Sequence, residues 1–132
     1  MVTRYLLDSS VAVRILLGHS QPAARWFDAA TADEESSVIA SRLLRTELTR
    51  VLRREGQPVA LRDEILDHVG ILPVSEQVLA EAEAIVPHLK TLDAIHLASL
   101  IRTGMDAVVV THDARMREVA ELVGFAVFDP VA

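Results

Sequence analysis

Short apolar runs alternate along the chain with stretches of helical periodicity. The clearest run, Ala107–Val110, is continuously apolar and consists mostly of β-branched residues, which favours a strand covered on both faces. Such strands are typical of parallel sheets, because helices pack on both sides of them. The pattern predicts five strands: Arg4–Leu7, Ser37–Ala40, Ile71–Val74, Ala107–Val110 and Phe125–Phe128.

Helical stretches fill the intervals between these runs. Gly18 and Gly56 end two of the stretches, and Pro22 and Pro58 stand where the next ones begin, as is usual at helix ends. Strands separated by helices imply right-handed crossovers and a mostly parallel α/β sheet, whose strand order the pattern leaves open. The predicted helices are Ser10–Leu17, Pro22–Thr31, Arg42–Arg54, Ala60–His68, Gln77–Leu89, Ala94–Arg102 and Ala114–Val123.

Three aspartates stand at places where a functional site is expected. Asp8 follows the first predicted strand and Asp113 the fourth, while Asp93 opens a strongly apolar helix. Ligands of open parallel sheets bind beyond the carboxyl ends of the strands. Each aspartate also has a simpler explanation: Asp8 and Asp113 as helix N-caps, and Asp93 as a first-turn acid favoured by the helix dipole.

Glu47 is harder to explain as an ordinary surface residue. It lies three residues after Leu44 and four before Val51, on the apolar stripe of its predicted helix. A glutamate that faces a core either takes up a proton or finds a cation. The alternative is a residue at the edge of the stripe that pairs with Arg50 or Arg54, and we favour the functional interpretation.

The four acids together suggest a metal site. Carboxylates held together at low dielectric repel one another, and a cation relieves that repulsion. We therefore expect a hard divalent metal at Asp8, Glu47, Asp93 and Asp113. His96 shares a helix face with Asp93, but oxygen ligands favour a hard ion over zinc. We interpret His96 as a packed or supporting histidine rather than a ligand.

Composition limits the class of protein. The 132 residues suffice for one domain, and the absence of cysteine excludes disulfides and thiolate chemistry. No apolar run approaches the ~20 residues needed to cross a bilayer, and the first residues lack the layout of a signal peptide. We expect a soluble, cytoplasmic protein without membrane association.

The charge distribution leaves a nucleic-acid partner possible. The net charge of −6 argues against one, because phosphate binding favours a basic surface. However, five arginines flank Glu47 within a short segment: Arg42, Arg45, Arg50, Arg53 and Arg54. They could guide RNA phosphates past the acids or form a solvated helix face with Glu55 as a partner, and both interpretations stay open.

Four segments of this chain carry a combined motif: Leu6–Ser10, the helix around Glu47, Leu92–Ala98 and Val110–Asp113. Together they resemble the PIN-domain ribonucleases, and among these the VapC-type toxins of toxin–antitoxin pairs. The match runs from Tyr5 to about Phe128, and the combination is specific although each motif alone is weak.

The resemblance implies a single PIN domain over residues 1–132 with a five-stranded parallel sheet of order 3-2-1-4-5 and about seven helices. Asp8 and Asp93 would be the principal ligands of Mg²⁺ or Mn²⁺, and Asp113 and Glu47 would complete the pocket directly or through water. Thr111 would hydrogen-bond near the metal and support the acids. Ser9 occupies a position where the family often has a small hydroxyl residue.

The resemblance also implies the partners. The substrate would be RNA, cleaved by hydrolysis at the acidic pocket, and the protein would form a homodimer inhibited by a cognate antitoxin. The first two predicted helices carry many apolar residues, so we expect them to form part of the antitoxin groove or of the dimer interface. These residues are Val11, Val13, Ile15, Leu16, Leu17, Trp26 and Phe27.

Two other functions fit parts of the pattern. A receiver domain that accepts a phosphoryl group is also a small α/β fold with an acidic Mg²⁺ pocket, but it uses paired acids after its first strand and a lysine near the last. Here Asp8 stands alone, and the only lysine, Lys90, precedes a helix. The second alternative is a non-catalytic PIN-like module that binds RNA or a protein, for which four clustered acids would be costly.

Overall fold

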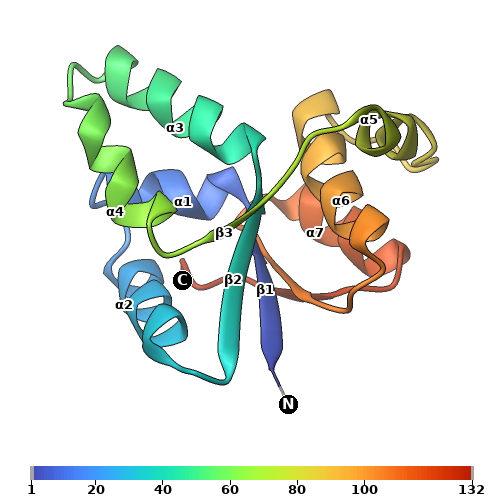
Figure 1. Cartoon of the computed structure of the whole chain (residues 1–132), viewed down its shortest axis with the longest axis horizontal. Helices are drawn as coiled ribbons and strands as arrows, with labels where there is room; N and C mark the ends of the chain where they lie inside the picture. Colours follow the sequence, from blue (N-terminus) through green and yellow to red (C-terminus); the bar gives the residue numbers. More distant parts are fainter. Residues whose placement is uncertain (1, 132) are drawn as a thin grey trace.

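Five parallel strands form the centre of the molecule (Figure 1). The structure, a computed structural model, describes residues 2–131. The strand order is β3-β2-β1-β4-β5, which confirms the expected sheet. The strands are β1 Thr3–Leu7, β2 Ser36–Ser41, β3 Gly70–Leu72, β4 Val108–Val110 and β5 Ala126–Phe128.

Helices cover both faces of this sheet, α1 to α4 on one side and α5 to α7 on the other (Figure 1). The described residues contain seven α-helices and one 3₁₀ helix, in agreement with the expected number. They are α1 Ser9–Leu16, α2 Gln21–Ala32, α3 Leu43–Arg54, η1 Val59–Arg62, α4 Asp63–Leu66, α5 Glu76–Glu83, α6 Thr91–Thr103 and α7 Ala114–Leu122.

Side chains of the central strands point alternately to the two faces, because the side-chain period of a strand is two. Leu7 and Val110 pack against α1 to α4, whereas Leu6 and Val109 pack against α6 and α7. All four are fully buried. This double covering explains why the strand segments read as continuous apolar runs.

Two predicted helices are shorter than expected. The prediction Gln77–Leu89 was wrong at its end, because α5 stops at Glu83. The predicted range also contains a proline at 87, which disfavours helical geometry in the residue before it. The predicted helix Ala60–His68 is a 3₁₀ turn followed by the single turn of α4. The third strand begins at Gly70 and ends before Pro73, since proline cannot donate a ladder hydrogen bond.

The apolar side chains of the first two helices are buried to different degrees. Val11 and Phe27 are buried, and the other five side chains of the predicted set are half-buried. Trp26 packs edge-on against Tyr5, with ring centroids 5.5 Å apart. The exposed large hydrophobic residues among residues 2–131 are Val2, Ile71, Val86, Leu92, Leu122, Val123 and Phe128. Five of the seven side chains are thus partly accessible, and the expected partner groove on α1 and α2 stays a prediction.

The central strands bring distant turns together at one end of the sheet. Leu7 of β1 is in register with Val110 of β4, and the backbone N–H of Asp8 donates to the Val110 carbonyl at 3.0 Å. The residues that follow the two strands, Asp8 and Thr111, are therefore neighbours. No helix within residues 2–131 has the length and apolarity needed to span a membrane.

Candidate active site

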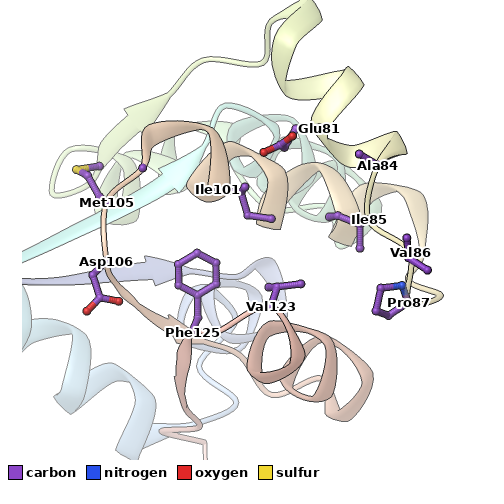
Figure 2. A pocket seen from close by; sticks show the side chains of 11 residues that line it. Glu81, Ala84, Ile85, Val86, Pro87, Ile101, Met105, Asp106, Val123 and Phe125 are labelled. Atoms are coloured by element: carbon purple, nitrogen blue, oxygen red, sulfur yellow. The ribbon is translucent and has the colours of Figure 1, made fainter.

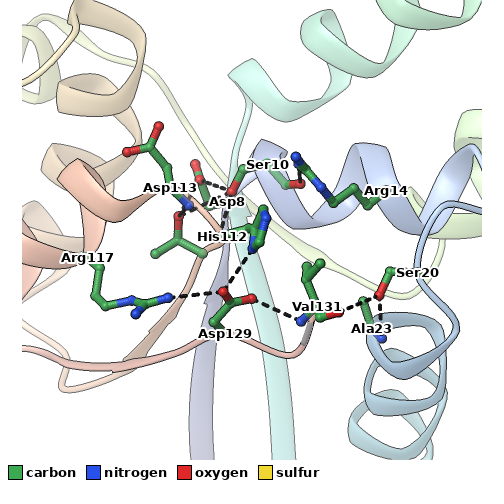
Figure 3. Close-up of polar contacts among 11 residues, drawn as sticks. Asp8, Ser10, Arg14, Ser20, Ala23, His112, Asp113, Arg117, Asp129 and Val131 are labelled. Atoms are coloured by element: carbon green, nitrogen blue, oxygen red, sulfur yellow. Dashed lines mark hydrogen bonds and ion pairs between the residues drawn. The ribbon is translucent and has the colours of Figure 1, made fainter.

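Asp8 is the most deeply buried acid of the site, with 1% of its surface exposed. Its Oδ2 atom accepts hydrogen bonds from Ser10 Oγ at 2.7 Å and from Thr111 Oγ1 at 2.8 Å (Figure 3). Its Oδ1 atom is buried and has no hydrogen-bond partner among residues 2–131. A buried carboxylate oxygen without a partner is costly, so this atom is available for a cation.

Thr111 and Ser10 tie the two turns of the site together. The buried Thr111 hydroxyl also accepts from the Asp113 backbone N–H at 3.1 Å, and Ser10 Oγ accepts from the His112 backbone N–H at 2.9 Å. Thr111 thus lies beside the acids, where it was expected. The hydroxyl that bonds to Asp8 belongs to Ser10, which the sequence did not single out, whereas Ser9 lies in the lining of the same cavity. The sequence did contain a signal for this bond, because a serine two residues away from an aspartate often makes a short-range hydrogen bond.

Asp113 and Asp93 lie at helix N-termini, and both line a cavity that they share with Asp8 and Glu47. Asp113 caps α7 by accepting from the Met116 backbone N–H at 2.9 Å, which confirms its simpler role as a helix cap. Asp93 lies in the first turn of α6. Burial, followed by the charges of Asp8 and Asp113, raises the pKa of Asp93 from 3.8 to about 6, with Glu47 adding to the rise and His96 opposing it.

Glu47 pairs with His96, and not with Arg50 or Arg54. Glu47 projects from α3, and its Oε1 atom makes a hydrogen bond with Nε2 of His96 on α6. His96 is fully buried, with 0% of its surface exposed. Burial by itself would lower the pKa of His96, but the hydrogen bond and charge of Glu47, with Asp8 and Asp93, outweigh burial and raise it.

A cavity of about 530 Å³ brings the four predicted acids together. Three cationic residues share its wall: Arg14, Arg54 and Lys90. Of the arginine cluster on α3, only Arg54 reaches this lining. The sequence did not single out Arg14, whose guanidinium donates to the Ser10 carbonyl at 2.7 Å. Its position one helical turn after Ser10 was the only local signal, because residues four apart share a helix face.

The donor set of this cavity fits a hard divalent cation held partly through water. No group of three Asp, Glu or His side chains within residues 2–131 is arranged to coordinate one ion directly. Mg²⁺ does not need such a cage, since it keeps several waters and usually takes one or two protein carboxylates. Asp8 suits that role best, because its Oδ1 atom is buried without a partner.

A second polar cluster lies beside the site and holds the chain after β5 (Figure 3). Asp129 Oδ2 accepts from His112 Nδ1 at 2.9 Å and from Arg117 Nη2 at 3.0 Å, and its Oδ1 accepts from the Val131 backbone N–H at 3.0 Å. Burial by itself would raise the pKa of Asp129, but these three donors hold it below its usual value. The cluster therefore anchors the last described residues.

A larger cavity, of about 670 Å³, lies away from the acids between the end of α5, α6 and the start of β5 (Figure 2). Its lining is mostly apolar, and Phe125 projects into it. The two acids in the lining, Glu81 and Asp106, lie apart in this view, so they do not form a paired carboxylate site. The acidic cavity is therefore the candidate active site.

Comparison with known proteins agrees with this geometry. The family model of the PIN domain matches residues 5–122 of the chain. The chain belongs to the PIN-domain family. This PIN domain is of the VapC type: it is 34% identical over 132 residues to ribonuclease VapC47 of Mycobacterium tuberculosis strain CDC 1551, a match that covers 96% of each chain.

Solved structures support the same fold. The toxin–antitoxin complex from Klebsiella pneumoniae contains a chain with a TM-score of 0.71 at 18% identity, covering 96% of this PIN domain and 97% of that chain. VapC20 of Mycobacterium tuberculosis, described as a toxin that cleaves the sarcin–ricin loop, has a TM-score of 0.69 at 19% identity, with 92% and 96% covered. The observed strand order also differs from the 2-1-3-4-5 order of receiver domains, which removes that alternative.

Proposed function

We propose that the protein is a metal-dependent endoribonuclease, the toxin of a toxin–antitoxin pair, that hydrolyses RNA phosphodiester bonds at its acidic cavity. The observation that carries the proposal is the buried Oδ1 atom of Asp8, which has no partner among the described residues and belongs to a cavity with three further acids. A relative that shares 34% of its residues is named a ribonuclease.

The chain's own residues would hold a divalent cation and its waters in a defined position. Ser10 and Thr111 fix Asp8 through its Oδ2 atom, which leaves Oδ1 for the ion. Asp93 would be the second direct ligand, and Asp113 and Glu47 would act directly or through water. A bound Mg²⁺ or Mn²⁺ supplies a water of lowered pKa and stabilises negative charge that develops on the phosphoryl oxygens.

The cationic residues of the cavity wall would position the RNA backbone. Arg14, Arg54 and Lys90 lie on the same lining as the four acids, and such side chains orient nucleic acids through phosphate contacts. Leu92, next to Asp93, is 49% exposed and belongs to the same lining. It offers an apolar surface for a base of the substrate. The remaining arginines of α3 would extend the basic path.

The antitoxin and a second copy of the chain are the proposed protein partners. The toxin–antitoxin complex from Klebsiella pneumoniae contains a chain of this fold. An antitoxin segment that carries arginine or lysine would complement the four acids, since opposite charges at low dielectric attract strongly. The homodimer rests on the family resemblance.

Cleavage of total cellular RNA tests the proposed activity. We expect discrete fragments with Mg²⁺ or Mn²⁺, none with EDTA, and a loss of at least ~100-fold in Asp8→Asn, because a single electrostatic contact in an active site is worth that much. Asp28→Asn is the matched control, since Asp28 lies exposed on α2 outside the cavity. Hydrolysis of the bond between phosphorus and the 3′-oxygen should leave fragments with 5′-phosphate and 3′-hydroxyl ends.

Two results would contradict the proposal. Cleavage that persists in EDTA would remove the metal from the mechanism. The absence of cleavage by folded, antitoxin-free protein with either metal would favour the non-catalytic module that binds RNA or a protein. Mapping the fragments identifies the target RNA and its cleavage sequence.

A further inference from the structure

His96 occupies an unusual position for a titratable side chain. It is fully buried on α6, three residues after Asp93. Its Nε2 atom bonds to Oε1 of Glu47, whereas its Nδ1 atom is buried and has no partner among residues 2–131. The contact with Glu47 is therefore the only side-chain hydrogen bond that the structure gives this ring.

The chemistry of the pair fixes the direction of that hydrogen bond. A carboxylate oxygen accepts hydrogen bonds, so we assign the Nε2–H group of His96 as the donor of the bond to Oε1 of Glu47. Leaving Nδ1 unpaired in the interior costs free energy. A leucine would fill this place without an unpaired nitrogen, so packing alone does not account for the imidazole.

The pair also joins two helices that reach the site from opposite faces of the sheet. Glu47 belongs to α3, which packs with the core of α1 to α4, and His96 belongs to α6 on the other face (Figure 1). Within residues 2–131, no other side-chain hydrogen bond links α3 to α6. Glutamate has several rotatable side-chain bonds, so a fixed donor is needed to hold its carboxylate at one place in the cavity wall.

We propose that His96 is a positioning residue for Glu47, which it holds by an Nε2–H···Oε1 hydrogen bond so that this carboxylate faces the divalent cation and its waters. The inference rests on the proposed metal-dependent activity of the same cavity. Residues that orient metal-bound groups commonly contribute about 10-fold to 100-fold in metal affinity or activity.

Four variants separate positioning from a merely structural role: His96→Leu, His96→Gln, Glu47→Gln, and the double variant His96→Leu/Glu47→Gln. The readouts are the Mn²⁺ affinity, from the metal-dependent rise in Tm, and kcat and KM for RNA cleavage. We expect His96→Leu to weaken Mn²⁺ binding about 10-fold or more and to lower kcat more than it changes KM. His96→Gln should restore part of both, because its amide nitrogen can occupy the place of Nε2.

The double variant decides whether His96 acts only through Glu47. If His96 acts only through Glu47, adding His96→Leu to Glu47→Gln should change Mn²⁺ affinity and kcat less than twofold, because the two substitutions then share one effect. Ser99→Ala is the matched control. Ser99 is a buried polar residue on the same helix and bonds to the Ile95 carbonyl, away from the acids, so this variant should bind Mn²⁺ and cleave RNA as the natural protein does.

Several outcomes would overturn the inference alone. These are an unchanged Mn²⁺ affinity and kcat in folded His96→Leu, a His96→Gln variant as impaired as His96→Leu, and full additivity in the double variant. If His96→Leu does not fold, His96→Asn takes its place, since its shorter amide cannot reach Glu47. A natural protein that neither gains Tm with Mn²⁺ nor cleaves RNA would instead overturn the proposed function, and the positioning role with it.

Discussion

At the scale of single residues, the site is built on carboxylates whose environments differ although their chemistry is the same. Asp8 is buried and held by two hydroxyl groups, whereas burial and three neighbouring acids raise the pKa of Asp93 to about 6. Such separated environments are a feature of functional sites, where charges are placed for a task at a cost to stability. That cost should be measurable in the metal-free protein.

Asp93→Asn should stabilise the metal-free protein at neutral pH. The pKa of Asp93 in the folded protein is about 6, above its ordinary value of 3.8. Protonation of Asp93 therefore stabilises the folded state, fully so below about pH 4. This stabilisation is lost as the pH rises through about 6. Allowing for solvent screening, we expect a gain on the order of 1–2 kcal/mol above about pH 7 and none below about pH 4. Urea unfolding in EDTA at several pH values measures this difference.

A destabilised Asp93→Asn at neutral pH would contradict this account of the site. The control is Asp28→Asn on the exposed surface of α2, for which no gain is expected at any pH. The same Asp93→Asn variant should lose the response of its Tm to Mg²⁺, because the substitution removes one of the two proposed direct ligands.

At the scale of secondary structure, three of the four acids lie at helix N-termini, where an acid can both support the helix and line the cavity. Asp113 shows how the two roles combine, since it caps α7 and also lines the acidic cavity. A cap and a metal-site acid require the same residue type at the same position, because both use the oxygen of a short side chain at a helix N-terminus. The two roles can be separated by substitution.

Asp113→Asn and Asp113→Ala should affect stability differently and cleavage alike. Asparagine caps helices about as well as aspartate, whereas alanine loses about 1 kcal/mol of stability. Both remove the charge from the cavity, so both should reduce cleavage about 10-fold or more. Ser75→Ala is the matched control, since Ser75 caps α5 by accepting from the Val78 backbone N–H. It should lose similar stability with no loss of cleavage, and an active Asp113→Asn would refute the role of the charge.

At the scale of the whole molecule, the site exists only where both faces of the sheet meet. The cavity takes Glu47 from α3 on one face, Asp93 from α6 on the other, and Asp8 from the turn after the central strand β1. A cation that binds this arrangement cannot bind the unfolded chain in the same way. Metal binding should therefore stabilise the entire fold, and not a single loop.

Mg²⁺ should raise the Tm of the natural protein as its concentration increases. Above the Kd, each tenfold increase in Mg²⁺ adds about 1.4 kcal/mol to the free energy of unfolding, which corresponds to a rise of about 3–6 °C for a chain of this size. Asp8→Asn should show little or no rise, whereas Asp28→Asn should behave as the natural protein does. Equal rises in all three proteins would place the cation elsewhere.

Local patterns in the sequence determined much of this molecule. Continuous apolar runs identified the five strands, because a strand covered on both faces needs apolar residues throughout. Glycine and proline marked several helix boundaries. The four acids were recognised because two follow strands, one opens an apolar helix and one interrupts an apolar stripe. The strand order came from resemblance to a family, since hydrophobic periodicity carries no information on which strands are neighbours.

Only the tertiary structure decided how the acids are held. The bond from Ser10 to Asp8, the pairing of Glu47 with His96, and the place of Arg14 in the cavity wall were not predicted. The apolar residues of α1 and α2 divide into buried ones, Val11 and Phe27, and half-buried ones, and sequence periodicity did not distinguish the two groups. The physical reason is the same in each case: periodicity is a property of neighbouring residues, whereas burial and side-chain pairing depend on how distant elements pack.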